Sequence, residues 1–243
     1  MLEIETLQDP AAIAVRAADI FMADAVAAIR SRGSFSVALS GGSTPLGQYG
    51  MLTHEPYLGK IYWPKCFLFW GDERCVPPND TDSNYLRAMV TLISKIPIPI
   101  GNIHRIHGEL PAEQAAAAYE SELRSHFGSL PIFDLILLGI GPDGHTASLF
   151  PGTSALEEKE KWVVSVPHST PPPPLVDRVS LTLPVIDAAR HVVFLAAGAE
   201  KAEIVARIFS KDRSEPLLPA QRVDPHPGKL TWLLDQSAAS RLS

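Results

Sequence analysis

Cysteine is scarce in this sequence, with 2 residues in 243. Cys66 lies in an apolar run and Cys75 follows in a nearby loop. Neither their number nor their spacing indicates a disulfide framework or a zinc site. Because free thiols suit a reducing compartment, we expect a cytoplasmic protein.

Long apolar runs and excess positive charge are also missing. No apolar stretch reaches the ~20 residues that a membrane span needs, and the amino terminus lacks the basic region and apolar core of a signal peptide. The formal net charge of −6 argues against a broad nucleic-acid footprint. With 46% hydrophobic residues, the chain can still bury a full core. We therefore expect neither a nucleic acid nor a membrane as partner.

Signatures of metals and organic cofactors are absent as well. His104 and His107 are three residues apart, but no set of cysteines or carboxylates completes a metal site around them. No serine stands in a Gly-x-Ser-x-Gly elbow, which argues against a serine hydrolase. His168 and His226 lie in proline-flanked loops and are predicted to be solvated. We expect no metal and no cofactor.

What the sequence does contain is an alternation of strands and helices. A helix is predicted from Asp9-Pro10, a capping residue followed by proline at the first helical position, to Gly33. Further strands are predicted at 35–39, 66–70, 133–138, 162–166, 179–183, 192–196 and 230–234, and helices at 83–95, 111–127 and 199–209. This order predicts an α/β fold: a single domain over residues 1–243 with a mainly parallel, Rossmann-like sheet flanked by helices. The prolines at 171–174 are predicted to form a rigid extended loop within it.

Four predicted loops combine glycine with polar or charged residues, at 40–44, 71–74, 139–145 and 198–201. Each follows a predicted strand. Because the carboxyl ends of parallel strands meet at one edge of the sheet, where ligands of such folds bind, the four loops are expected to form one site.

The loop at 139–145 carries the strongest signal, because it presents Asp143 and His145 just before a segment compatible with a helix. Histidine exchanges protons near cellular pH. An aspartate two residues earlier can hold one ring nitrogen and leave the other free to act as a base. The positive end of a helix would disfavour the imidazolium form. The alternative is a glycine-rich turn in which His145 is solvated and Asp143 serves as a helix N-cap.

The loop Ser40-Gly-Gly-Ser-Thr-Pro45 leads into a predicted helix. Gly41 and Gly42 permit close backbone approach, Ser43 or Thr44 can cap the helix, and the free N–H groups there suit a phosphate. The segment matches neither the dinucleotide fingerprint nor the nucleoside-triphosphate loop. A helix cap without a ligand is the alternative.

Cationic side chains in the other loops extend the anion site. Arg74 can bind a phosphate through two parallel hydrogen bonds, although an ion pair with Asp72 or Glu73 is the alternative. Lys201 lies in the first turn of a predicted helix, where a cation is unfavourable unless an anion is near; a solvated lysine is the alternative. Arg178 opens a strand and is a further candidate. The candidate substrate-binding residues are Gly41, Gly42, Ser43, Thr44, Asp72, Arg74, Arg178 and Lys201.

Taken together, these segments resemble the 6-phosphogluconolactonases, whose fold is shared with the glucosamine-6-phosphate deaminases. The match runs from about residue 40 to residue 235, and its most specific part is Gly139-Ile-Gly-Pro-Asp-Gly-His-Thr-Ala-Ser-Leu-Phe-Pro-Gly152. It also includes Phe69-Trp-Gly-Asp-Glu-Arg74, Arg178-Val-Ser-Leu-Thr-Leu-Pro184, Ala197-Gly-Ala-Glu-Lys201 and Trp232-Leu-Leu-Asp235.

The resemblance implies hydrolysis, without a metal, of 6-phospho-D-glucono-1,5-lactone to 6-phosphogluconate in the pentose phosphate pathway. By position, His145 is the implied general base, Asp143 its neighbour in the site, and Arg74 and Lys201 the implied phosphate ligands. The expected partner is thus a small phosphorylated sugar lactone, bound by a monomer or weak homo-oligomer.

One departure separates this chain from the deaminases. Their Asp-Gly-His motif continues with Asn-Glu-Pro-Gly, whereas this chain reads Leu149-Phe-Pro-Gly152, so that Phe150 replaces a glutamate. Because a phenyl ring exchanges no protons, the sequence favours the lactonase over the isomerase or deaminase. A non-catalytic sugar-phosphate-binding module is the other alternative, but no basic helix-turn-helix segment accompanies the domain.

Overall fold

A parallel sheet lies at the centre of the computed structural model, which describes residues 1–42, 44–210 and 216–242. All neighbouring strands in this sheet run parallel, in the order β1-β9-β8-β5-β2-β3. The strands are β1 (Leu2–Leu7), β9 (Lys229–Asp235), β8 (His191–Ala196), β5 (Leu135–Leu138), β2 (Phe35–Leu39) and β3 (Cys66–Trp70). Every residue of β2, β5 and β8 is buried, as expected for strands covered on both faces. The predicted α/β class with a mainly parallel sheet is confirmed.

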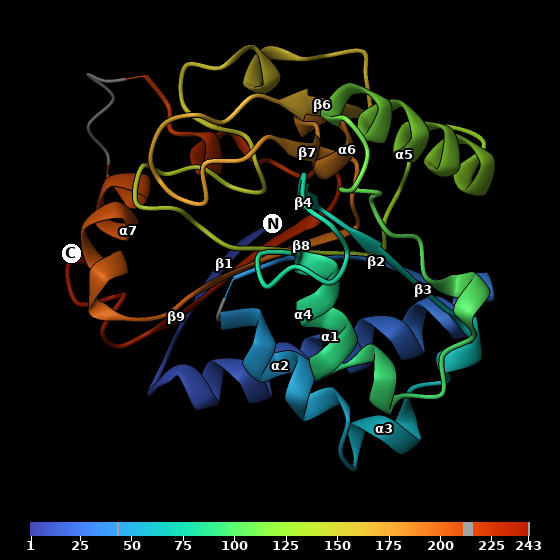
Figure 1. The fold of residues 1–243 in the computed structure, drawn as a ribbon. Coiled ribbons are helices and arrows are strands. Elements are labelled where there is room, and N and C mark those ends of the chain that lie inside the picture. Colours follow the sequence, from blue (N-terminus) through green and yellow to red (C-terminus); the bar gives the residue numbers. More distant parts are fainter. Residues whose placement is uncertain (43, 211–215, 243) are drawn as a thin grey trace.

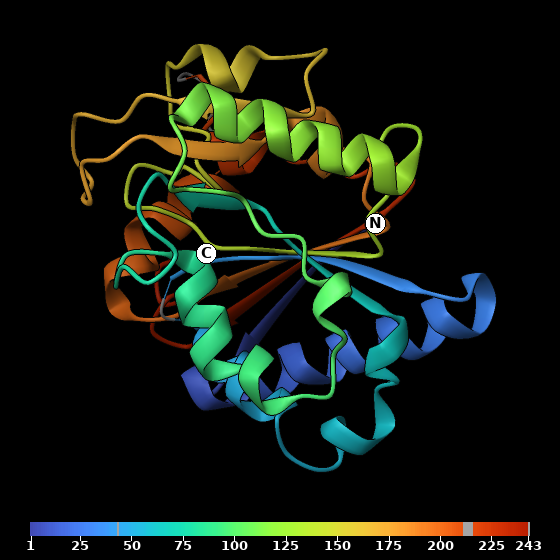
Figure 2. The ribbon, with the colours of Figure 1, turned by 45° about the vertical axis from the view of Figure 1, so that its right-hand side comes forward.

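Helices cover both faces of this sheet (Figure 1). One face carries α1 (Pro10–Arg32), α2 (Thr44–Leu52), α3 (Tyr57–Lys60) and α4 (Asn84–Thr91); the other carries α5 (Ala112–Phe127) and α6 (Leu183–Asp187), as Figure 2 shows with the sheet closer to edge-on. The helix α7 (Ala202–Phe209) lies near the carboxyl terminus. Short 3-10 helices occur at Trp63–Lys65, Ile93–Lys95, Ile100–Asn102, Ser154–Glu157, Ala199–Lys201 and Pro219–Arg222. Within the described ranges, no helix combines the length and the apolar character that crossing a membrane requires.

The first helix follows its sequence signals closely. The Asp9 carboxylate accepts a hydrogen bond from the Ala12 N–H at 2.8 Å, and Pro10 occupies the first helical position. The helix ends at Gly33, whose φ of 84° is in the left-handed region that favours glycine. Ile13 and Phe21 are among its buried residues. The predicted helix between Asp9 and Gly33 is confirmed.

A second, antiparallel sheet corrects the predicted strand series. It consists of β4 (Asp72–Arg74), β7 (Arg178–Leu181) and β6 (Val163–Val166), in the order β4-β7-β6. The sequence placed β6 and β7 in the same series as the parallel strands and assigned 71–74 to a loop. A short apolar run predicts a strand but does not indicate which other strand it pairs with. Only the tertiary structure could therefore show that the strands divide into two sheets.

The edge strand β1 was not predicted. It pairs with β9 in parallel, from Leu2 opposite Leu230 to Leu7 opposite Asp235. Exposed and half-buried residues alternate along it, and Leu2 and Ile4 are exposed. Because this edge strand buries little apolar surface, it lacks the continuous apolar run by which the central strands were recognised.

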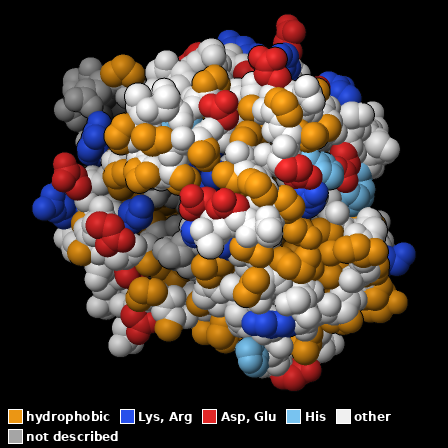
Figure 3. Space-filling view, viewed as in Figure 1, with side chains coloured by type: hydrophobic (Ala, Val, Ile, Leu, Met, Phe, Trp, Pro, Cys, Tyr) orange, Lys and Arg blue, Asp and Glu red, His pale blue; other side chains and the backbone are white. Residues whose placement is uncertain are grey.

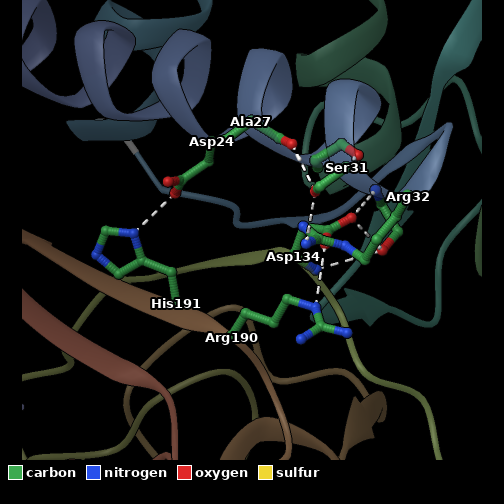
Figure 4. A network of polar contacts seen from close by, with 9 residues as sticks. Asp24, Ala27, Ser31, Arg32, Asp134, Arg190 and His191 are labelled. Atoms are coloured by element: carbon green, nitrogen blue, oxygen red, sulfur yellow. Dashed lines mark hydrogen bonds and ion pairs between the residues drawn. The ribbon is translucent and has the colours of Figure 1, made fainter.

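An ionic network holds the amino ends of the central strands (Figure 4). Asp134 precedes β5, and one of its carboxylate oxygens accepts hydrogen bonds from Arg32 Nε and Nη2 at 3.1 and 2.6 Å. The other accepts from the Ser36 N–H at 2.9 Å, and Arg190 Nε lies 3.4 Å from the carboxylate. The network thus joins the end of α1 to β2, β5 and β8, and leaves the carboxyl ends of the strands for a site.

Candidate active site

A cavity of about 120 Å³ lies at the carboxyl ends of β2, β3 and β5. Its lining comes from the loop after β2, from β4, from the first residue of α4, from the loop after β5 and from the first residue of β7: Ser40, Gly41, Gly42, Asp72, Arg74, Asn84, Gly139, Ile140, His145, Ala147 and Arg178. In the space-filling view, acidic and basic side chains occur together near the middle of the face seen in Figure 1, and hydrophobic ones gather below and to the right of them (Figure 3). Three of the four predicted loops therefore contribute directly to one cavity.

His145 and Asp143 form a close pair in the loop after β5. His145 Nδ1 lies 2.5 Å from Asp143 Oδ1, which also accepts the His145 backbone N–H at 3.2 Å. Burial of Asp143 opposes its charge, but the hydrogen bonds and the attraction of His145 outweigh this effect and lower the pKa of the carboxyl. An ionised Asp143 requires the proton on Nδ1, so Nε2 is the ring nitrogen left with a lone pair.

Gly141 makes room for the His145 ring. A Cβ added at Gly141 would lie 2.0 Å from both Nδ1 and Cε1 of His145, far inside contact distance. The His145 backbone carbonyl accepts a hydrogen bond from the Gly141 N–H at 2.9 Å. Glycine is therefore required at this position by the close approach of the ring.

The predicted helix start after His145 is wrong. Thr146 and Leu149 form an isolated bridge around a turn, and the next helical residues are the 3-10 turn Ser154–Glu157. Thus no helix begins directly after His145, and Asp143 is not an N-cap. Phe150 instead packs against His145, with ring centroids 4.5 Å apart. The electrostatic partner of His145 is the Asp143 carboxylate.

Two arginines face each other across β4 and β7. Arg74 and Arg178 are directly paired in the antiparallel register. Arg74 Nη1 donates to the Asp82 carbonyl at 2.6 Å, and Arg178 Nη2 donates to the Pro174 carbonyl at 2.9 Å. The Nε atom of each is buried and has no hydrogen-bond partner among the described residues. Burial lowers the pKa of Arg178, and the nearby Arg74 adds to that effect while Asp72 opposes it. Paired cations with free donors are suited to an anion.

The acids beside Arg74 do not pair with its guanidinium. The Glu73 carboxylate accepts hydrogen bonds from the backbone N–H groups of Arg74, Asn84 and Tyr85 at 2.7–2.8 Å. Asp72 accepts the Ser148 hydroxyl at 2.6 Å. These contacts leave Arg74 available to a ligand.

The remaining predicted ligands differ in whether they line this cavity. Gly41 and Gly42 line it, whereas Thr44 begins α2 outside the lining. Ser43 lies outside the described residues. Lys201 is also outside the lining, but its Nζ donates to the carbonyl of Ile140, a lining residue, at 2.9 Å.

His168 is buried, which corrects the prediction that it is solvated. Its ring stacks on Phe150 with centroids 4.3 Å apart, and its Nε2 lies 2.7 Å from the Pro172 carbonyl. The ring thereby joins the proline loop to the side chain that packs on His145. The proline flanks suggested a solvated loop, but the composition of a loop does not reveal what it packs against. His226 is exposed, as predicted.

Asn84 and Ser148 were missed by the sequence interpretation. Both are buried next to Asp72, and Asn84 lines the cavity. A signal for Asn84 was present, because Ser83 is an N-cap residue that fixes where α4 begins. Ser148 gave no such signal, since a serine inside an apolar turn has many possible partners.

Comparisons with known proteins show which family the chain is similar to. The family described as glucosamine-6-phosphate isomerases/6-phosphogluconolactonase matches residues 8–232. A probable chloroplastic 6-phosphogluconolactonase 3 of Oryza sativa subsp. indica is 44% identical over 227 residues, which cover 89% of this chain and 68% of that protein. The 6-phosphogluconolactonase of Homo sapiens is 44% identical over 220 residues, covering 88% and 83% respectively. The structure of a 6-phosphogluconolactonase from Trypanosoma cruzi superposes with a TM-score of 0.88 at 31% identity, covering 100% of this chain and 97% of that one.

Proposed function

The chain belongs to the family of glucosamine-6-phosphate isomerases and 6-phosphogluconolactonases, and on that premise we propose that it hydrolyses 6-phospho-D-glucono-1,5-lactone to 6-phospho-D-gluconate in the pentose phosphate pathway. The relatives that support this proposal are named as lactonases and match nearly nine tenths of the chain. The observation that carries it is the cavity shared by a histidine with a free ring nitrogen and by two arginines with unpartnered donors.

His145 acts as the general base in this proposal. Neutral imidazole with its proton on Nδ1, held by Asp143, takes a proton from water through Nε2 as the water oxygen attacks C1 of the lactone. The tetrahedral intermediate then breaks its bond between C1 and the ring oxygen, and the imidazolium returns the proton to that oxygen. The products are a carboxylic acid, which ionises, and a free hydroxyl. General-base assistance of this kind contributes a factor of about 10²–10⁴ in rate.

The cationic wall of the cavity holds the phosphate. Arg74 and Arg178 contribute their guanidinium charges to the lining, Gly41 and Gly42 allow close backbone approach, and the Lys201 ammonium donates to the carbonyl of Ile140. The phosphate is remote from C1, so its binding orients the lactone for attack rather than taking part in bond breaking. No step in this mechanism calls on a metal.

Phe150 supports the lactonase over the deaminase. Its ring packs directly on His145, in the position where a deaminase motif has a glutamate. Isomerisation of an amino sugar needs a second group that exchanges protons, and phenylalanine has none. We therefore expect no ammonia release from glucosamine 6-phosphate, and an enzymatic ammonia assay tests this directly.

The decisive experiment follows acid release from freshly prepared 6-phosphogluconolactone, corrected for spontaneous ring opening. We expect His145→Ala to lower kcat by about 10²–10⁴ with little change in KM. His54→Ala, which removes an exposed histidine two residues beyond the end of α2, is the matched control and should behave as wild type. Unchanged turnover by His145→Ala would refute the role of His145, and absence of turnover by the wild type would refute the proposed function itself.

A further inference from the structure

Asn84 is a buried amide that touches two walls of the cavity. It is the first residue of α4 and only 2% exposed. Its Nδ2 donates to the backbone carbonyl of Asp72 at 2.9 Å and to Asp72 Oδ1 at 3.3 Å. Its Oδ1 is buried and has no hydrogen-bond partner among the described residues. A buried amide with one unpaired end calls for an explanation.

The unpaired end of Asn84 lies against the glycine loop. A Cβ added at Gly41 would be 2.0 Å from Oδ1 and 2.5 Å from Cγ of Asn84. Gly41 is not among the glycines with positive φ, so the backbone itself would accept another residue. Glycine is needed at position 41 because the amide occupies the space of a side chain.

The hydrogen bonds that Asn84 donates to Asp72 show that this side chain does more than fill space. An apolar side chain of the same shape would avoid the cost of the unpaired acceptor, but it would offer no donor to Asp72. The amide therefore combines a bond to β4 with a steric contact to the loop after β2. Arg74 follows Asp72 by two residues in β4. By holding Asp72 and contacting Gly41, Asn84 therefore helps to set the distance between the glycine loop and the Arg74 guanidinium.

From these contacts we infer that Asn84 is a positioning residue. It fixes the distance between the glycine loop, Gly41 and Gly42, and the two arginines, Arg74 and Arg178, that are proposed to bind the phosphate. This role rests on the proposed lactonase function. Among the described residues, the Asn84 side chain donates to Asp72 and not to His145 or Asp143, which come from the loop after β5. We therefore expect Asn84 to act on binding of the phosphorylated substrate and not on proton transfer.

A kinetic split tests the role of Asn84. We expect Asn84→Ala to raise KM for 6-phosphogluconolactone about tenfold, because the glycine loop and Arg74 lose the contact that spaces them, while kcat stays within about twofold of wild type. Alanine is a good helix former, so α4 retains its first turn. An unchanged KM, or a loss confined to kcat, overturns the inference.

Asn102→Ala provides the matched control. Asn102 Nδ2 also donates two hydrogen bonds, to the carbonyls of Pro64 at 3.1 Å and Cys66 at 2.9 Å, but it lies outside the cavity lining. This variant should lower the melting temperature without moving KM. If both variants raise KM equally, the effect of Asn84→Ala is general loss of stability and the inference is wrong.

A double-mutant cycle with Gly41→Ala tests the contact itself. Alone, the added methyl must displace the amide, so KM should rise; in the Asn84→Ala background it has room, and it should add nothing further. Additive effects overturn the inference. Should Asn84→Ala fail to fold, Gly41→Ala carries the test, since a wild-type KM in that variant is incompatible with the contact. If the wild type does not hydrolyse the lactone, the proposed function is wrong. If the wild type is active but Asn84→Ala has an unchanged KM, only this inference is wrong.

Discussion

The His145 ring fills the volume that any side chain at position 141 would need, and this makes Gly141 a sensitive probe of the proposed base. Substitution Gly141→Ala would place a methyl 2.0 Å from the ring and force it to turn away from Asp143. We expect kcat to fall by about 10–100-fold, because a small misplacement of the base is costly, while KM changes little. Steady-state kinetics on the lactone check this. Gly50→Ala, at a glycine with open space around its Cβ position, is the control.

The proposed role of Arg74 in binding the phosphate can be tested by comparing a phosphorylated with an unphosphorylated lactone. We expect Arg74→Ala to raise KM for the phosphorylated lactone by about 10–100-fold, since a charge-assisted hydrogen bond to phosphate is lost, with a much smaller effect on unphosphorylated gluconolactone. Arg74→Lys should recover part of the binding, because it keeps the charge and loses the planar fork. Equal losses on both lactones would speak against a phosphate contact.

At the scale of elements, α6 and the segment 219–226 meet at a half-buried acid, Asp187. The Asp187 carboxylate accepts the Asp224 N–H at 2.9 Å, and its backbone carbonyl accepts the His226 N–H at 3.1 Å. Burial raises the pKa of Asp187 to about 6, and the nearby Asp224 adds to the shift. An acid with a raised folded-state pKa is costly when ionised. The cost is therefore complete above about pH 6 and disappears as the pH falls toward the ordinary value for aspartate.

Removing this charge is expected to stabilise the fold at neutral pH. Asp187→Asn retains an oxygen for the Asp224 N–H and should raise the free energy of unfolding by about 1 kcal/mol at pH 7, after allowance for solvent screening. The gain should shrink as the pH is lowered through about 6. Urea unfolding at several pH values measures it, with the exposed Glu160→Gln as control. A gain that grows toward acid pH would contradict the sign of this argument.

At the scale of the whole molecule, the chemistry and the structural support lie at opposite ends of the central sheet. Asp134 joins α1, β2, β5 and β8 at their far end (Figure 4). We expect Asp134→Ala to lower the free energy of unfolding by about 2–4 kcal/mol, since it leaves a buried N–H and two arginines without their partner, while kcat and KM stay unchanged. Chemical denaturation and the lactone assay together check this. A changed KM would indicate that the two ends are coupled.

One hydrophobic core cluster includes residues from both sheets and from helices on both faces. This continuity supports our interpretation of residues 1–243 as a single domain. Arg74 and Arg178 lie in β4 and β7. We therefore expect substitutions that destabilise the small antiparallel sheet to displace these two arginines in the cavity.

Local patterns predicted the elements whose signals are local. The helix α1 has a cap, a first-turn proline and a terminal glycine, and the strands β2 and β3 are uninterrupted apolar runs; these were found at or near their true bounds. Three of the four predicted loops contribute to one cavity, as the order of strands and loops in the sequence predicted, and Arg74, His145, Gly41 and Gly42 line it. The proline run could be placed in a loop, but not against Phe150 through His168.

The sequence alone determined most of the helices and the central strands, and which residue types can transfer a proton or bind an anion, because backbone propensity and side-chain chemistry belong to each residue and its near neighbours. Only the tertiary structure decided that Arg178 faces Arg74, that Asn84 lies against Gly41 and that a turn, not a helix, follows His145. Those facts depend on contacts between segments far apart in the chain, and no local pattern records the distance between two such segments.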